Sequence, residues 1–217
     1  MDFVTRDKWN RAAKSFDLMA GFGPEKRWAP FKRALFAKMG EGKILFLAVG
    51  TGLDIQFFPP DRTIVGIDIS DRMLEQARPR AAAYRGRLEL QQVDVHEMPF
   101  AEDSFDQVFT SCTFCSVPNP VAALRAVHRV LKPGGELHMF EHTGSRFFPF
   151  NVMLDMMTPL SRAFGPDLNR PTVENVMAAG FRLTAVRHVY LDVVKTISAV
   201  KPHPDNGFIP GSPCMAG

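Results

Sequence analysis

The sequence predicts an α/β fold, a doubly wound sheet of seven strands that is mostly parallel, with one antiparallel strand near the C-terminus. From residue 43 onward, short apolar runs alternate with amphipathic runs, which is the pattern of parallel strands joined by helical crossovers. The pattern changes in the last quarter, where two strand-like stretches at 182–190 and 193–200 are separated by only two residues. So short a connection favours a hairpin, which reverses the chain and adds one antiparallel strand.

Five strands before that hairpin are predicted from apolar or alternating runs that end in turn or helix signals. They are expected at 44–49, 63–69, 88–95, 107–112 and 136–141. The helices between them start at residues that can cap a helix, since Ser70 and Asn119 offer side-chain oxygens to free backbone amides. A short helix at 52–58 is expected to stop at Pro59 because proline cannot continue a helix. A last helix is expected to run from Pro171 to Gly180.

We expect three regions: an N-terminal helical arm at 1–43, the main domain at 44–201 and a Pro/Gly-rich tail at 202–217. The net charge of +3 is too small to indicate nucleic acid as a partner. The arm holds ten Lys or Arg against five Asp or Glu, and both tryptophans. Two interpretations of this basic, aromatic arm stay open: helices that pack over the active site, or peripheral contact with an anionic membrane surface.

The three cysteines, Cys112, Cys115 and Cys214, are too few and too scattered for a disulfide framework, and no second pair or histidine cluster completes a metal site. The first residues lack the apolar core of a secretion signal, and no apolar run reaches the ~18 residues of a membrane span. A cytoplasmic protein, either free or peripheral to a membrane, is therefore expected. The oligomeric state cannot be predicted from the sequence.

A glycine turn and an acidic residue carry the strongest functional signal. The run ILFLAVGTGLD at 44–54 ends in Gly50-Thr51-Gly52, and Asp68 closes the next apolar run eighteen residues after Gly50. Glycines let the backbone approach a ligand, and a carboxylate at the second strand tip can accept hydrogen bonds from ribose hydroxyls. The third glycine of a redox dinucleotide site and the lysine of a phosphate-binding loop are both missing, so a nucleoside cofactor without phosphates fits better.

Four segments resemble the motifs of class I S-adenosylmethionine-dependent methyltransferases, in order and in spacing. They are LAVGTG at 47–52, GID at 66–68, VDVHEMPFAEDSFDQVF at 93–109 and RVLKPGGEL at 129–137. The resemblance implies a Rossmann-like fold and S-adenosyl-L-methionine as cofactor. It implies that Asp68 holds the ribose hydroxyls and that Asp94 meets the adenine amino group. The cofactor-binding residues would be Ala48, Gly50, Thr51, Gly52, Asp68, Ile69, Asp94, Val95 and Ser111.

Two positions depart from the family pattern. Phe46 stands where the family usually has an acidic residue, and Ala48 stands at the first glycine of the turn. The missing carboxylate usually orients the turn and supports the amino end of the cofactor. Either Asp54 or the N-terminal arm is a candidate to replace it.

The methyl acceptor should lie beyond the carboxyl ends of the central strands. His142, after the fifth strand, is the candidate general base because its pKa lies near neutrality, and Asp155 is a second candidate catalytic residue. Substrate-lining residues are expected to be Phe16, Phe114, Cys115 and His142. The Phe- and Met-rich stretch at 147–164 is compatible with a lid over an apolar acceptor, a membrane-contacting segment or a core helix.

The predicted function is methylation of a small or lipid-like apolar acceptor at sulfur or nitrogen. The segments CSVPNP at 115–120 and GPDLNRPTVENVMAAGF at 165–181 are similar to alkyl-thiol methyltransferases and phospholipid N-methyltransferases. FDLMAG at 16–21 resembles ubiquinone/menaquinone C-methyltransferases, so a quinone-type C-methyltransferase is an alternative. A non-catalytic cofactor-binding protein of the same fold is another. A nicotinamide oxidoreductase is disfavoured by the missing third glycine.

Overall fold

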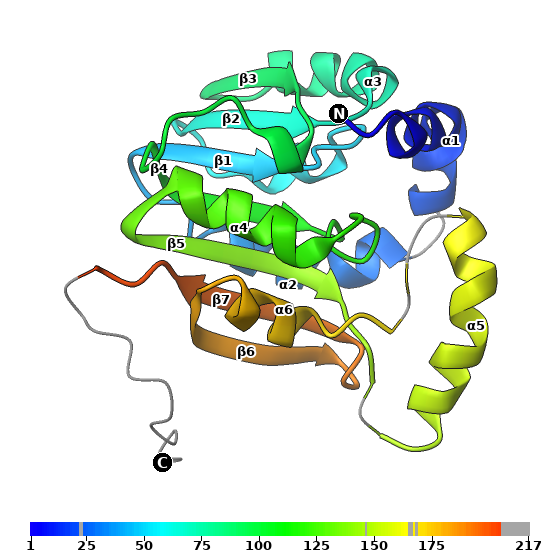
Figure 1. Cartoon of the computed structure of the whole chain (residues 1–217). Helices are drawn as coiled ribbons and strands as arrows, with labels where there is room; N and C mark the ends of the chain where they lie inside the picture. The colour runs from blue at the N-terminus through cyan, green and yellow to red at the C-terminus, as the bar shows by residue number, and fades with distance from the viewer. Residues whose placement is uncertain (22–23, 146, 165–166, 168, 205–217) are drawn as a thin grey trace.

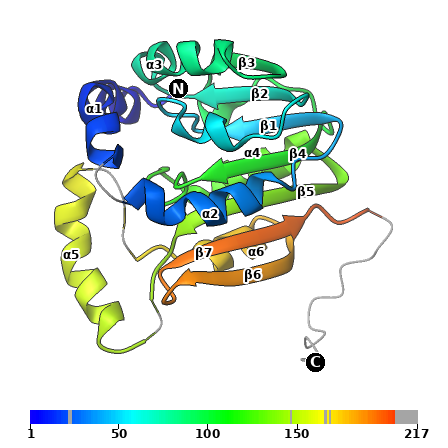
Figure 2. The same cartoon turned by 180° about the vertical axis from the view of Figure 1, so that it is seen from behind.

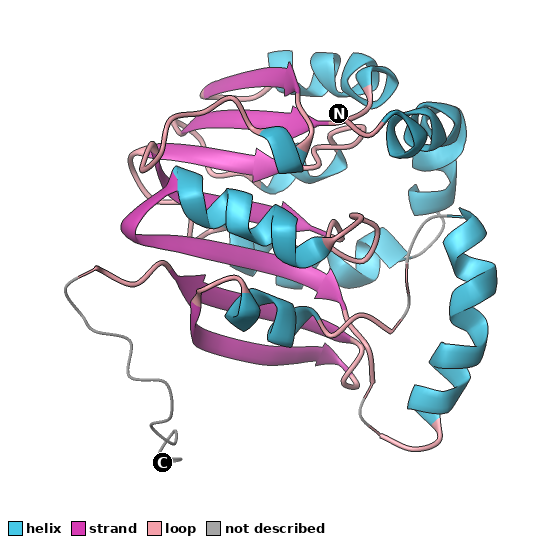
Figure 3. Cartoon of the chain, in the orientation of Figure 1, coloured by secondary structure: helices cyan, strands magenta, loops and turns pink. Residues whose placement is uncertain are grey.

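Seven strands form one sheet with helices on both faces, as predicted (Figures 1 and 3). The computed structural model describes residues 1–21, 24–145, 147–164, 167 and 169–204. The strand order is β3-β2-β1-β4-β5-β7-β6. The strands are β1 (Lys43–Leu47), β2 (Thr63–Asp68), β3 (Arg87–Gln92), β4 (Phe105–Ser111), β5 (Leu131–His142), β6 (Arg182–Tyr190) and β7 (Val194–Val200).

The sheet reverses its order at β1, because β1 pairs in parallel with β2 on one side and with β4 on the other. β5 continues the parallel part beside β4, and β7 then pairs antiparallel with both β5 and β6. In the described part of the chain β7 is thus the strand that runs against the others, which confirms the predicted hairpin. The reversal matters because ligands of such sheets bind outside the carboxyl ends of the strands at this point.

Helices cover both faces of the sheet. The helices are α1 (Phe3–Gly21), α2 (Pro24–Phe36), α3 (Asp71–Ala82), α4 (Pro120–Val130), α5 (Phe150–Phe164) and α6 (Thr172–Ala178), with short 3-10 helices η1 (Leu53–Phe57) and η2 (Val95–Glu97). α4 and α6 lie over one face, whereas α2 crosses the opposite face (Figures 1 and 2). α1 packs against α3 at the carboxyl edge of the sheet, and α5 stands at the same edge (Figures 1 and 2).

Two apolar cores, one on each face, hold the helices to the sheet. The first joins the inner sides of α4 and α6 to β4 and β5, with Leu124, Val127 and Val176 fully buried. The second joins α2 and α3 to β1 and β2. Phe46 belongs to this second core, with ring centroids 5.6 Å from Phe36 and 4.9 Å from Phe58. Such edge-to-face and tilted contacts add to the burial of apolar area, so Phe46 has a structural role.

The largest difference between a predicted and an observed boundary is at the start of β5. β5 begins at Leu131, whereas the sequence predicts a strand at 136–141, so residues 131–135 already belong to the strand. Phe105 pairs with Leu131, and the register then shifts before Gln107 pairs with Glu136. Between these two pairs β5 has the four residues 132–135 and β4 has only Asp106, so this bulge leaves the extra residues of β5 without partners on β4.

Some predictions concern residues that the structure does not describe. Most of the tail at 202–217, including Cys214, lies outside the described residues. Within the described helices, none is both long enough and apolar enough to cross a lipid bilayer.

Candidate functional site

A cavity of about 420 Å³ opens at the carboxyl ends of the parallel strands. Its floor is made by the residues that follow β1, β2, β3, β4 and β5, and its cover comes from α1 and α2. Most of the lining is apolar, with a few polar side chains that converge on it. A mostly apolar pocket with a few converging polar groups is typical of a small-molecule or cofactor site.

The glycine turn after β1 adopts left-handed backbone angles at three alternate positions. The φ angles are 50° at Ala48, 58° at Gly50 and 85° at Gly52. A β-carbon added to Gly52 would lie 2.9 Å from the Cδ1 atom of Ile55 and 3.2 Å from the backbone of Ala77. Glycine is therefore needed there both for φ and for the close approach of α3. Ala48 adopts the same kind of φ with a side chain, which costs roughly 1–2 kcal/mol.

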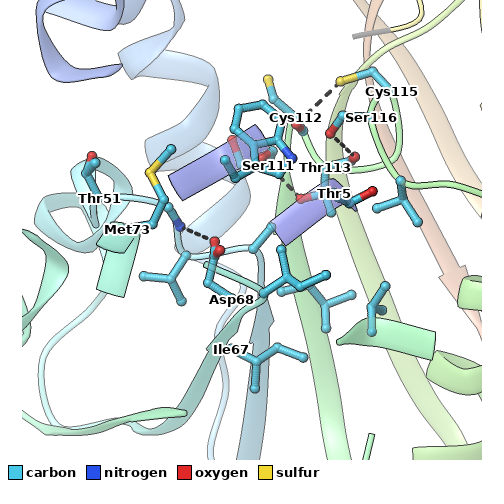
Figure 4. A pocket seen from close by; sticks show the side chains of 18 of the residues that line it. Thr5, Thr51, Ile67, Asp68, Met73, Ser111, Cys112, Thr113, Cys115 and Ser116 are labelled. Carbon is cyan, nitrogen blue, oxygen red and sulfur yellow. Dashed lines mark hydrogen bonds between the residues drawn. The ribbon is translucent and has the colours of Figure 1, made fainter. Parts of the chain in front are cut away.

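Asp68 is held in place by the backbone at the tip of β2. Its Oδ2 atom accepts a hydrogen bond from the Gly50 amide and its Oδ1 atom from the Ser70 amide, each at 2.8 Å. Burial raises the pKa of Asp68 to about 6, although these amides act in the opposite direction. The carboxylate lines the cavity, on the side opposite the turn at Ser111–Ser116 (Figure 4). It can therefore accept further hydrogen bonds from a ligand.

Asp94 follows β3 and forms hydrogen bonds both within the cavity floor and to the segment just before α1. It accepts hydrogen bonds from the backbone amides of Asp2 at 2.8 Å and His96 at 3.0 Å, and it contacts His96 Nδ1 at 2.9 Å. Burial alone would raise the pKa of Asp94, but the bonds from His96 and Asp2 outweigh it and lower the pKa. Asp94 is therefore an ionised hydrogen-bond acceptor at neutral pH.

Helix α1 covers this part of the cavity with apolar side chains. Trp9, Ala12 and Phe16 line the cavity, and the rings of Trp9 and Phe16 meet edge to face at 6.3 Å. Asp17 attaches the helix to the glycine turn: Thr51 donates its hydroxyl to Asp17 at 2.5 Å, and Arg80 contacts Asp17 at 2.6 Å. The cover is thus tied to the same turn that shapes the floor.

His142 and Cys112 meet in the cavity at the ends of β5 and β4. The Cys112 sulfur lies 3.7 Å from His142 Nδ1. Burial is the main cause that lowers the pKa of His142, and the nearby charge of Lys32 is the second. The imidazole is therefore neutral at pH 7. Burial is also the main cause that raises the pKa of Cys112 to about 12, and the charge of Glu141 is the second. This thiol therefore stays protonated.

Glu141 supports the turn after β4 from beneath. It is fully buried and accepts hydrogen bonds from the backbone amides of Thr113 at 3.0 Å and Phe114 at 3.1 Å. Burial raises the pKa of Glu141 to about 7 against the lowering effect of those amides. The carboxyl group therefore fixes the turn that carries Cys112, Cys115 and Ser116 into the cavity.

The comparisons with known proteins agree with this geometry. A family profile described as a methyltransferase domain matches residues 45–139. The ubiquinone/menaquinone biosynthesis C-methyltransferase UbiE of Geotalea daltonii is 32% identical over 164 residues, which cover 68% of this chain and 70% of that protein. The chain belongs to the class I S-adenosylmethionine-dependent methyltransferases. Its cofactor is S-adenosylmethionine, as the motifs implied.

Other relatives of this methyltransferase point the same way. The demethylmenaquinone methyltransferase of Symbiobacterium thermophilum is 32% identical over 69% of this chain and 64% of its own length. The chain thus covers less than two thirds of several curated relatives that it matches.

Solved structures share the fold. Haemonchus contortus phospholethanolamine N-methyltransferase 2 was solved with phosphomonomethylethanolamine and S-adenosylhomocysteine. The comparison of its structure with this chain gives a TM-score of 0.68 at 18% identity, over 92% of this chain and 61% of that one. An S-adenosylmethionine-dependent methyltransferase of Mesorhizobium loti has a TM-score of 0.62 at 19% identity, over 80% and 97% of the two chains. At such identities these structures support the fold.

The residues of the methyltransferase fit its cofactor. An ionised acceptor at Asp94, a buried carboxylate at Asp68 and a cradle of glycines suit a nucleoside without phosphates. Eight of the nine residues expected to bind the cofactor line one cavity: Ala48, Gly50, Thr51, Asp68, Ile69, Asp94, Val95 and Ser111. Gly52 does not line it, because its α-carbon faces Ile55 and Ala77 instead. Among the described residues no group of acidic, histidine or cysteine side chains is placed to hold a metal ion.

Two expected site residues lie elsewhere. Phe114 is fully buried in the core beneath α4 and α6, because the turn after β4 points its side chain inward while its amide faces Glu141. Asp155 is on the exposed helix α5, where its carboxylate accepts a hydrogen bond from Asn169, and it does not line the cavity. The positions of these two side chains could not be predicted from spacing in the sequence. Phe16, Cys115 and His142 do line the cavity.

Sequence reasoning missed several residues in and around the site. Trp9 and Met73 contribute apolar lining, Arg80 bonds to the Thr51 carbonyl at 2.6 Å as well as to Asp17, and Lys32 lines the cavity from α2. Arg80 lies near the end of α3, one turn beyond Gln76, which donates to the Ala13 carbonyl at 2.8 Å. Their periodic placement on α3 was the available signal for a face that meets another helix.

Proposed function

We propose that this methyltransferase methylates a small apolar acceptor at sulfur or nitrogen. The observation that carries the proposal is the position of a neutral histidine, His142, in a mostly apolar cavity where the neighbouring thiol is protonated. A thiol, or an amine in its protonated form, must lose a proton to become a nucleophile, and a neutral imidazole can accept it.

The bound cofactor would supply an electrophilic methyl group on a sulfonium. The residues that support its binding are Asp94 for the adenine, Asp68 for the ribose hydroxyls and the glycine turn for close approach of the backbone. His142 would take the proton of the acceptor as the acceptor lone pair forms its bond to the methyl carbon and the methyl–sulfur bond breaks, leaving its electron pair on the sulfur. In the tautomer that donates Nδ1–H to the Cys112 sulfur, the Nε2 lone pair is available for this proton.

The protein would contribute chiefly by positioning and by excluding water. Thr113 and Ser116 are the polar residues of the turn that Glu141 fixes, and both line the cavity beside Cys115. Trp9 and Phe16 close the other side. Holding two reactants in line can lower a barrier by roughly 7–11 kcal/mol, so this cavity needs few catalytic groups.

A quinone-type C-methylation is the second candidate function. It is supported by relatives at 32% identity whose names specify ubiquinone, menaquinone or demethylmenaquinone chemistry. Such an acceptor is apolar, so the cavity lining is compatible with it. Its reaction also places a proton on a base, because the attacked ring carbon must lose its hydrogen.

A screen of methyl acceptors would separate these candidates. The full chain would be incubated with methyl-labelled cofactor and with alkyl thiols, alkyl amines, phenols, reduced quinones or phospholipids. Label transferred to a thiol or amine supports the proposed function, and transfer only to a reduced quinone supports the second candidate. Binding of S-adenosylhomocysteine without transfer to any class would favour a non-catalytic cofactor-binding protein.

Peripheral membrane contact is a proposal of the same kind. α5 and the loop before it expose large apolar side chains at the edge that carries the cavity: Phe147, Phe148, Val152, Met153, Met156 and Met157. α1 exposes Phe3, Val4 and Leu18 at the same edge and belongs to the basic arm. Apolar side chains beside basic residues bind anionic membrane surfaces, and an apolar acceptor would reach the cavity from there. Sedimentation with phosphatidylglycerol vesicles, compared with phosphatidylcholine vesicles, tests this.

A further inference from the structure

The reaction proposed above assigns no ligand contact to a buried ion pair in the cavity. Lys32 on α2 donates from Nζ to the Oδ1 atom of Asp54 on η1 at 2.8 Å. The two side chains are only 8% and 13% exposed, yet both line the cavity. Taking two charges out of water costs several kcal/mol per ion, which their attraction repays only in part. A hydrophobic pair would hold α2 to η1 at lower cost, so the charges themselves need an explanation.

The pair lies in the cavity between Asp68 on one side and Cys112 and His142 on the other. Asp68 is at the tip of β2, the glycine turn follows β1, and Asp54 comes two residues after Gly52. On the other side, the charge of Lys32 acts on both Cys112 and His142, which follow β4 and β5. Strands β2, β1, β4 and β5 are neighbours in that order, so the ion pair comes next after Asp68 along the edge.

The cofactor carries its own pair of opposite charges beyond the ribose. The methionine part of S-adenosylmethionine ends in an ammonium and a carboxylate on one carbon atom. A cavity must offer a negative and a positive partner side by side to bind such a zwitterion without leaving a charge uncompensated. At the end of β1, Phe46 turns into the aromatic core and offers no polar atom.

We propose that Asp54 and Lys32 bind the amino acid end of the cofactor, with Asp54 receiving the ammonium and Lys32 the carboxylate. Each residue has the capacity to do so and keep its present partner. A carboxylate offers about four lone-pair sites and an ammonium three donors. The Lys32 ammonium also lies 5.8 Å from the centre of the Phe140 ring, which orients it from the sheet side.

The assignment depends on the cofactor of the family and on its orientation along the edge, not on the identity of the acceptor. It also distinguishes two roles for Lys32. A residue that binds the cofactor changes the affinity for the amino acid group, whereas a residue that binds the acceptor leaves that affinity unchanged. The test therefore compares two ligands that differ only in this group.

Calorimetry with S-adenosylhomocysteine and 5′-methylthioadenosine makes this comparison, because the second ligand keeps the adenosine and the sulfur but lacks the amino acid. Asp54→Asn and Lys32→Met should each weaken S-adenosylhomocysteine binding by about tenfold or more, the scale of one charge-assisted hydrogen bond. Binding of 5′-methylthioadenosine should stay within about twofold of the unaltered protein. Lys132→Met is the matched control, because Lys132 pairs with Asp106 at 2.6 Å outside the cavity.

A second variant guards against misfolding. Removing both charges together in Lys32→Met/Asp54→Leu avoids an uncompensated buried charge, so it should fold and still lose the preference for S-adenosylhomocysteine. The unaltered protein alone gives a further readout, since it should bind S-adenosylhomocysteine much more tightly than 5′-methylthioadenosine. A parallel loss of both ligands in the variants, or no loss of either, would overturn the proposal. Failure to find any methyl acceptor would leave these binding results intact.

Discussion

At the scale of single residues, Asp68 combines a fixed position with a raised pKa. Because its pKa is about 6, lowering the pH through 6 protonates the carboxyl group and removes the ionised acceptor that we propose for the ribose hydroxyls. We expect the affinity for S-adenosylhomocysteine to fall below pH 6. Asp68→Asn should weaken binding at pH 8 by roughly 1.5–3 kcal/mol and abolish this pH dependence. Calorimetry at pH 5, 6 and 8 is the measurement, and an unchanged pH profile in the variant would remove Asp68 from this role.

Ala48 tests the cost of the unusual glycine turn. Its φ of 50° places a side chain in the left-handed region, so Ala48→Gly should relieve strain and raise the free energy of unfolding by about 1 kcal/mol. Urea unfolding measures the change. Ala126→Gly in the helical part of α4 is the control, and it should lower stability by about 1 kcal/mol because glycine is unfavourable there. Equal losses in both variants would show that Ala48 is not strained.

His142 can be tested separately from cofactor binding. If its imidazole accepts the proton of the acceptor, His142→Gln should slow methyl transfer by roughly 10²–10⁴-fold. S-adenosylhomocysteine affinity should stay nearly constant, since the proposed cofactor contacts lie on other residues. Single-turnover transfer to the acceptor found in the screen gives the rate. A fully active variant would exclude His142 as the base.

At the scale of elements, helix α1 is held over the cavity by Asp17. The ion pair with Arg80 is more than a third exposed on both sides, so solvent screening keeps its contribution to overall stability at most ~1 kcal/mol. Local opening is more sensitive than global unfolding. Asp17→Asn should therefore speed hydrogen exchange in α1 severalfold with little change in unfolding. Asp7→Asn, on the exposed Arg6 pair of the same helix, should leave exchange in α1 unchanged.

The elements that could be predicted from the sequence are those set by local periodicity. The strands and crossover helices follow from apolar runs and caps such as Ser70, whose hydroxyl accepts from the Met73 amide as expected. The inward direction of Phe114 could not be predicted, because it depends on a left-handed φ of 53° at Cys112 and on Glu141 beneath the turn. Lys32 was missed for a related reason: only the docking of α2 brings it to Asp54.

At the scale of the whole molecule, the carboxyl edge of the sheet collects the site from five strands, and its construction requires burying acidic groups. The order of β3, β2, β1, β4 and β5 places Asp94, Asp68, the glycine turn, Cys112 and His142 side by side. Because parallel strands share this edge, their tips could be predicted to converge from sequence order alone. The buried support beneath them, including Glu141, could not be predicted, because it depends on tertiary packing.

Glu141 links this site to the stability of the molecule. Its pKa is raised from 4.5 to about 7 in the folded chain, so the folded state binds more protons than the unfolded state between these values. The neutral carboxyl group is therefore favoured on folding, and stability should fall as the pH rises from about 4.5 to about 7, then level off. A shift of this size corresponds to roughly 3 kcal/mol for this one group.

Replacing Glu141 by an uncharged isostere should remove that contribution. The glutamine of Glu141→Gln cannot ionise. The free energy of unfolding of this variant should therefore fall less between pH 5 and pH 8 than that of the unaltered protein, even if the variant is less stable at pH 5. Urea unfolding of both proteins at pH 5, 6, 7 and 8 gives the two slopes. Glu102→Gln is the control, because Glu102 has an exposed side chain and should leave the slope unchanged. Parallel slopes in the unaltered protein and Glu141→Gln would mean that Glu141 is already ionised at pH 5, in which case the amides of Thr113 and Phe114 dominate over burial.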